Sequence, residues 1–162
     1  MVRLVRLCSL VFASVISEGG IFVSSKYNKY GGKNISNSTN YKKVTGTLKP
    51  DVIYNSGYGA NINASSGNDF IGNEGSNLLI KGGAGNDTIA SKAYNVTIEG
   101  GNGNDTLVTS TSYGDVFSFD NYDGHDVITN YGTKDTIYLK DVTSSRGFTS
   151  YKSGSSRIIK AG

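Results

Sequence analysis

Four aspartates at a fixed interval are the residues of this chain best suited to chemistry. The interval is 18 residues, and the aspartates are Asp51, Asp69, Asp87 and Asp105. The single cysteine, Cys8, and the single histidine, His125, lie outside this series. Carboxylates in series without thiol or imidazole groups favour a hard cation with oxygen ligands.

Two residues after each of these aspartates stands an apolar residue, and the apolar residues recur twice as often as the acids. Their period is nine residues, and they are Ile35, Val44, Ile53, Ile62, Ile71, Ile80, Ile89, Ile98, Leu107 and Val116. At the intervening positions the acid is replaced by Ala60, Leu78, Val96 and Gly114. A fixed period of this kind indicates a repeat architecture.

The two periods predict an all-β fold, a parallel β-roll in which each circuit has the length of the aspartate interval and contains two short strands. This two-sheet β-solenoid would stack successive coils about 4.8 Å apart. One sheet is predicted to align Ile53, Ile71, Ile89 and Leu107, and the other Ile62, Ile80, Ile98 and Val116. The full register corresponds to about five coils.

The turns between the predicted strands place all four acids along one edge of the roll. Glycine supplies positive φ at the corners, and asparagine at the fifth turn position also tolerates the left-handed conformation; these residues are Asn68, Asn77, Asn86, Asn95 and Asn104. Carboxylates one strand spacing apart would repel each other unless a cation lay between them. Flexible turns rich in carbonyl oxygens suit Ca²⁺ better than Mg²⁺. We predict one ion between the turns of Asp69 and Asp87 and another between those of Asp87 and Asp105.

Two segments, "GGAGNDTIA" (82–90) and "GGNGNDTLV" (100–108), resemble the RTX or hemolysin-type calcium-binding nonapeptide G-G-x-G-x-D-x-U-x. A third, "ASSGNDFIG" (64–72), matches except for Ala64 and Ser65. The resemblance implies a Ca²⁺-stabilised roll that holds about two ions, with further ions left open. The metal ligands it implies are Asp69, Asp87, Asp105, Gly67, Gly82, Gly83, Gly85, Gly100, Gly101 and Gly103.

Segments on either side of these copies depart from the pattern. "GTLKPDVIY" (46–54) has Lys49 and Pro50 in its turn, which favours a structural role for Asp51. Residues 115–139 are similar to the tail that follows RTX arrays, and Ile128 and Ile137 resume the spacing after a three-residue slip. Asp123 and Asp126 are left open as extra calcium contacts.

Composition supports turns and strands rather than long helices, because the chain has 22 Gly, 1 Pro and no Trp among 162 residues. The net charge of +3 is uneven, since residues 1–50 hold eight Lys and Arg against Glu18 alone. These basic residues form no recognisable nucleic-acid module, so no nucleic acid partner is expected. No apolar run is long enough to span a membrane.

The predicted organisation has five parts. Residues 1–17 are a signal peptide cleaved after Ser17 or a disordered leader, and 18–34 are an N-terminal flank or cap. The β-roll covers 35–117, irregular last coils cover 118–139, and 140–162 form a C-terminal flank compatible with truncation of a longer roll.

No nucleophile elbow, Cys/His pair or H-E-x-x-H motif supports catalysis, so we predict that the chain is not an enzyme. His125 is expected to be a solvated turn residue. Tyr113, Tyr122, Tyr131 and Tyr138 fit either a sugar-binding strip or simple packing.

The predicted function is that of a calcium-binding module of a secreted, extracellular or cell-surface protein. It would fold on binding Ca²⁺ and serve a structural or adhesive role. The alternative is the C-terminal repeat and secretion part of an RTX enzyme or cytotoxin whose active region lies elsewhere.

Overall fold

Short strands joined by tight turns make up the described part of the chain. The structure is a computed structural model that describes residues 29–110, 114–140, 148–154 and 156–161. The strands are β1 (Asn34–Asn37), β2 (Lys43–Thr45), β3 (Val52–Asn55), β4 (Asn61–Asn63), β5 (Phe70–Asn73), β6 (Leu78–Ala84), β7 (Thr88–Ser91), β8 (Val96–Asn102), β9 (Thr106–Val108), β10 (Val116–Phe119), β11 (Gly124–Thr129), β12 (Thr136–Leu139), β13 (Phe148–Ser153) and β14 (Ser156–Ala161). In these ranges no helix is long and apolar enough to cross a membrane.

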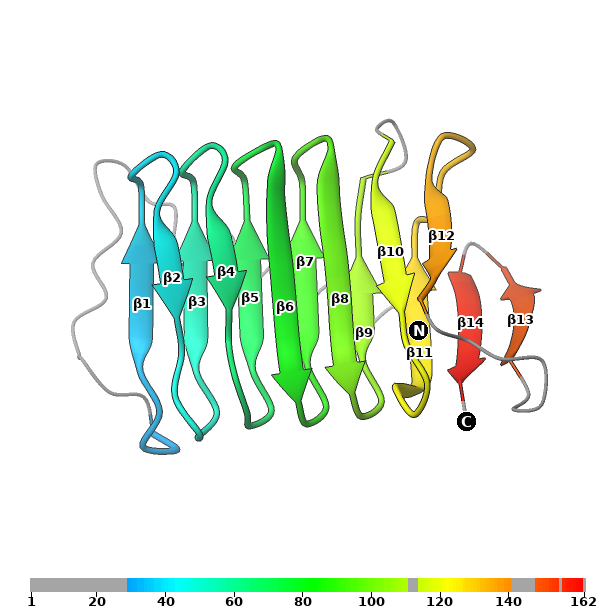
Figure 1. Cartoon of the computed structure of the whole chain (residues 1–162), viewed down its shortest axis with the longest axis horizontal. Helices are drawn as coiled ribbons and strands as arrows, with labels where there is room; N and C mark the ends of the chain where they lie inside the picture. The colour runs from blue at the N-terminus through cyan, green and yellow to red at the C-terminus, as the bar shows by residue number, and fades with distance from the viewer. Residues whose placement is uncertain (1–28, 111–113, 141–147, 155, 162) are drawn as a thin grey trace.

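From β1 to β12, the odd-numbered and even-numbered strands form two separate sheets (Figure 1). The first sheet has the order β1-β3-β5-β7-β9-β11-β14-β13, and the second has the order β12-β10-β8-β6-β4-β2. Strands β1 to β12 pair in parallel, so each odd strand and the even strand after it form one coil. The predicted all-β parallel β-roll is therefore confirmed.

The core lies between the sheets and consists of aligned files of apolar side chains. In the first sheet, Ile53 pairs with Ile71, Ile71 with Ile89, and Ile89 with Leu107. Each of these residues is fully buried. The second sheet aligns Val44, Ile62, Ile80 and Ile98 in the same way. The length of one coil thus equals the interval between the aspartates, as the sequence period predicts.

The prediction that Val116 continues the second file is wrong. Ile98 pairs with Phe117, which is fully buried, whereas Val116 pairs with Thr97 and is only partly buried. This coil is one residue longer than the coils before it because the connection from β9 to β10 contains an extra residue. A shift of one residue moves a side chain to the other face of a strand. Asp115, not Gly114, therefore occupies the position equivalent to Val96.

The predicted three-residue slip before Ile128 is confirmed, because Ile128 pairs with Leu107 and is fully buried. Beyond it, β13 and β14 form an antiparallel hairpin that pairs with β11, drawn in red in Figure 1. The sequence period did not predict this hairpin. The predicted signal or leader (1–17) and Tyr113 lie outside the described residues.

A ladder of buried amides connects the coils next to the core. The side-chain nitrogen of Asn37 donates to Oδ1 of Asn55 (2.7 Å), Asn55 donates to Asn73 (2.8 Å), and Asn73 donates to Oγ of Ser91 (3.1 Å). Asn73 also donates to the Gly75 carbonyl and accepts from the Gly75 amide. Because buried polar groups are costly unless hydrogen-bonded, this ladder fixes the register from coil to coil.

Candidate metal centre

The turns that lead from an even-numbered strand into the next odd-numbered strand form one long edge of the roll, along the bottom of Figure 1. We call this row, residues 46–51, 64–69, 82–87, 100–105 and 120–126, the aspartate edge. On it, the amide of Asp69 donates to Oδ1 of Asp87, and the amide of Asp87 donates to Oδ1 of Asp105, both at 2.8 Å. The same bond joins Asp51 to Asp69 (2.6 Å) and Asp105 to Asp126 (2.8 Å). Each aspartate is thus fixed by the coil before it.

The second carboxylate oxygen of these residues has no such bond. Oδ2 of Asp69, Asp87, Asp105 and Asp126 is buried and has no hydrogen-bond partner among the described residues. Burial raises the pKa of Asp69 and Asp105 to about 6 and that of Asp87 and Asp126 to about 8. Neighbouring carboxylates add to the increase, and the hydrogen bond from the backbone amide opposes it. Ionised carboxylates at these positions therefore require a positive partner.

Glycine leaves the space that these oxygens occupy. An added Cβ at Gly82 would collide with Oδ2 of Asp87, and one at Gly100 would collide with Oδ2 of Asp105. The position of this added Cβ at Gly82 also lies 2.5 Å from the carbonyl oxygen of Gly100, which belongs to the next coil. A carboxylate oxygen and a carbonyl oxygen from adjacent coils thus converge on a cradle that only glycine leaves open.

The corner glycines also present neutral oxygens. Gly67, Gly83, Gly85, Gly101 and Gly103 all have positive φ, between 98° and 142°. This conformation suits glycine because it has no Cβ. The carbonyl oxygens of Gly67 and Gly85 accept no hydrogen bond from a described residue. Such carbonyls are ligands that Ca²⁺ accepts.

The five turn asparagines divide between the two edges. Asn77 and Asn95 have positive φ, as predicted. Asn68, Asn86 and Asn104 do not adopt this conformation. Oδ1 of Asn68 instead accepts the amide of Asn86, and Oδ1 of Asn86 accepts the amide of Asn104. On the aspartate edge the glycines therefore make the sharp corners, and the asparagines link the coils.

No three His, Cys, Asp or Glu side chains converge on one point in the described part of the chain. Asp69, Asp87 and Asp105 are instead spread along the edge, one per coil. Because Ca²⁺ takes six to eight oxygens, backbone carbonyls would have to supply most of a ligand set here.

Asp51 differs from the aspartates of the edge that have a buried Oδ2 without a partner, because both of its oxygens accept hydrogen bonds. Oδ1 accepts the amide of Lys33, and Oδ2 accepts the amide and the hydroxyl of Thr47. This pattern supports the structural role predicted for Asp51.

Two aspartates outside the predicted set of metal ligands also have a buried Oδ2 without a hydrogen-bond partner among the described residues. Asp126 continues the aspartate edge, and its spacing before Ile128 carries the same sequence signal as Asp87 before Ile89. The opposite edge, formed by the turns from odd to even strands, holds Asp115. Its Oδ1 accepts the Val96 amide at 3.0 Å, and its Oδ2 is buried without a partner. The shifted register before β10 hid Asp115 from sequence reasoning.

The fold and this edge define a class of protein, the parallel β-roll whose glycine turns hold buried carboxylates. Residues 81–111 match the family described as RTX calcium-binding nonapeptide repeat (4 copies). The match covers both complete sequence copies, and the incomplete copy at 64–72 lies outside it. Comparisons with curated proteins and with solved structures gave no match. Residues 81–111 of the β-roll thus match RTX repeats, and repeats of this kind imply calcium binding.

Proposed function

We propose that this chain is a structural module that folds when Ca²⁺ fills its aspartate edge. The observation that carries the proposal is the buried, partnerless Oδ2 of Asp69, Asp87 and Asp105. In the proposed arrangement, one ion lies between the turns of Asp69 and Asp87 and another between those of Asp87 and Asp105. The glycines of these turns contribute carbonyl oxygens: Gly67, Gly82, Gly83, Gly85, Gly100, Gly101 and Gly103.

The chain's own residues explain why folding would depend on the ion. Successive aspartates are held one coil apart by the hydrogen bonds between coils, so folding itself concentrates negative charge along the edge. Bound Ca²⁺ supplies the compensating positive charge. A glycine-rich chain loses much conformational entropy on folding, and the binding free energy offsets part of this loss.

We place the module outside the cell, in a secreted or surface protein with a structural or adhesive role. Extracellular Ca²⁺ modules bind at about 10⁻⁴ to 10⁻³ M, well above the calcium concentration of a cytosol. A roll with a calcium affinity in this range would remain unfolded before export and would fold afterwards. Support comes from the RTX repeat and from the glycine turns that hold the carboxylates.

The hydrodynamic radius of the chain tests this proposal. Size-exclusion chromatography at pH 7.5 should show an expanded chain in EDTA and a compact one in millimolar CaCl₂. The control is millimolar MgCl₂, which should leave the chain expanded because Mg²⁺ demands a stricter geometry. An equal radius in all three solutions would refute the proposal.

The alternative role is that of the repeat part of an RTX enzyme or cytotoxin, and it would use the same aspartate edge. The two roles differ in whether a catalytic or pore-forming region belongs to the same protein. The encoding DNA on either side of this chain distinguishes them.

A further inference from the structure

The inner face of the first sheet continues beyond the sheet that faces it. β14 and β13 extend the first sheet past β11, whereas β12 is the last strand of the second sheet. Along the first sheet, Leu107 pairs with Ile128, Ile128 with Arg157, and Arg157 with Lys152. Residues paired directly across strands project to the same face. The row of buried apolar side chains on this face therefore ends in two cationic side chains, those of Arg157 and Lys152.

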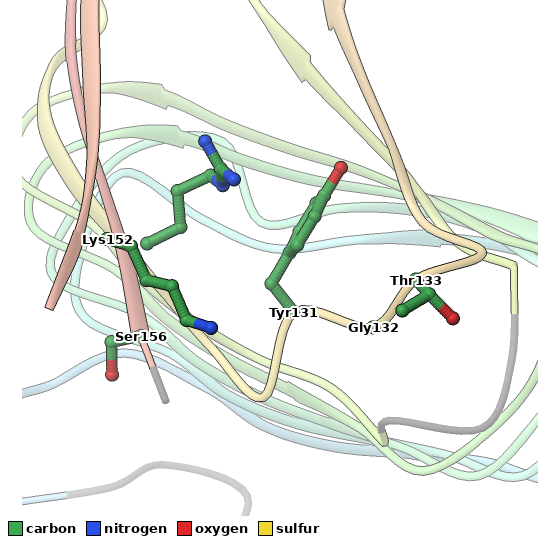
Figure 2. A pocket seen from close by; sticks show the side chains of 6 residues that line it. Tyr131, Gly132, Thr133, Lys152 and Ser156 are labelled. Carbon is green, nitrogen blue, oxygen red and sulfur yellow. The ribbon is translucent and has the colours of Figure 1, made fainter. Parts of the chain in front are cut away.

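These cations line a pocket of about 220 Å³ between the hairpin and the turn that joins β11 to β12. The other lining residues are Tyr131, Gly132, Thr133 and Ser156. In Figure 2 the Lys152 side chain extends from the hairpin toward Tyr131, and the Tyr131 ring stands across the space from it. The pocket lies on the edge of the roll opposite the aspartate edge.

The two positive charges of the pocket lie close together, and the Asp135 carboxylate accepts the amide of the lining residue Gly132. Lys152 and Arg157 occupy directly paired positions, and like charges opposite each other destabilise a sheet. Neither forms an ion pair with a described residue. The Arg157 guanidinium is nevertheless oriented, because its Cζ lies 5.0 Å from the centre of the Tyr131 ring and Nη1 donates to Oγ of Ser150 (3.2 Å). One donor of the guanidinium is used in this way, which leaves most of its donors available.

We infer that this pocket binds a small carboxylate of about the size of one sugar ring. The planar guanidinium matches the two oxygens of a carboxylate, and the Lys152 ammonium adds a second positive charge. Thr133 and Ser156 provide hydroxyls on the pocket wall, and Tyr131 provides an aromatic surface. The volume is below the usual range for drug-sized ligands, so the pocket fits one small acid or one end group of a larger molecule. This function is separate from calcium binding.

Titration of the full chain with sodium glucuronate tests the inference. Chemical shifts of the backbone amides are followed in saturating CaCl₂ at constant ionic strength, with glucose as the neutral ligand of similar shape. Glucuronate should shift amides of residues 131–133, 152, 156 and 157, and glucose should not. Lys152→Gln should weaken glucuronate binding about tenfold or more, because a hydrogen bond to a charged group is lost. Lys92→Gln, which removes an exposed charge outside the pocket, should bind as the wild type does.

Arg157→Lys keeps the positive charge but loses the planar fork, and it should also weaken binding. Circular dichroism in CaCl₂ confirms that each variant is folded. The inference is overturned if glucuronate does not bind, if glucose binds equally well, or if Lys152→Gln binds with unchanged affinity. Tighter binding of sodium sulfate than of glucuronate would overturn the assignment to a carboxylate.

Discussion

Asp87 and Asp105 are joined by one hydrogen bond, 2.8 Å from the amide of Asp87 to Oδ1 of Asp105, while Oδ2 of each is buried without a partner in the described part of the chain. The bond holds the two carboxylates one coil apart. Equivalent bonds link the other aspartates of the edge from coil to coil. Each inner aspartate therefore has a neighbouring carboxylate on both sides. Asp87 would contact both of the proposed ions.

Replacement of Asp87 by asparagine should therefore impair calcium binding without breaking the ladder. An asparagine at this position keeps an oxygen that can accept the Asp69 amide, but it removes the charge from both proposed ion sites. We expect the calcium midpoint of folding to increase about tenfold or more, equivalent to ~1.4 kcal/mol. Calcium titration followed by circular dichroism measures this midpoint.

The matched control for that variant is Glu74→Gln, which removes one exposed negative charge from the opposite edge. Glu74 forms only a surface ion pair with Lys92, at 3.8 Å, and such pairs contribute little. Its calcium midpoint should stay close to that of the wild type. If both variants shifted the midpoint equally, general charge rather than the aspartate edge would be responsible.

Asn73→Ala should destabilise the calcium-bound roll by about 2–4 kcal/mol. Asn73 is fully buried, and its loss would leave Nδ2 of Asn55 and the Gly75 amide without their acceptor. Urea unfolding in saturating CaCl₂ measures the change in the free energy of unfolding. Asn102→Ala removes an exposed amide and should cost well under 1 kcal/mol. Similar values for the two variants would show that the buried ladder adds no stability.

Without metal, the roll should be more stable in mild acid than in mild base. Folding raises the pKa of Asp87 and Asp126 from 3.8 to about 8, so the folded state retains protons that the unfolded chain has lost. Stability in EDTA should therefore fall as pH rises from about 4 to about 8. Circular dichroism in EDTA at several pH values tests this expectation through the fraction of folded chain, and a folded fraction that rises over this interval would be evidence against it.

Calcium should reverse that trend, because only the deprotonated carboxylates bind the ion. Melts in millimolar CaCl₂ should show greater stability at pH 8 than at pH 5. The same trend with and without calcium would indicate that the ion does not act at these carboxylates.

Most of the coil geometry could be predicted from the sequence because each coil repeats one buried residue per strand. Ile53, Ile71 and Ile89 recur at the period of the coil, so pattern alone specifies their register. The extra residue before Phe117 shifts the strand register, and the sequence pattern does not reveal the shift because Val116 is also apolar. The hairpin β13–β14 was missed for another reason: its antiparallel pairing does not follow the coil period.

The predicted site residues were found by spacing, but their environments needed the structure. Sequence spacing places Asp69, Asp87 and Asp105 in one row, yet it does not show that one oxygen of each is bonded and the other is free. The buried ladder of Asn37, Asn55 and Asn73 has the same period as the acids. Its signal was present in the sequence but was obscured by the many other asparagines.

The central claim is that calcium and folding are coupled, and far-UV circular dichroism tests it most directly. The chain is measured at pH 7.5 in EDTA and then in millimolar CaCl₂. We predict a coil spectrum in EDTA that converts to a β-sheet spectrum with calcium and returns on renewed chelation. A β-sheet spectrum of equal intensity in both solutions would contradict the account.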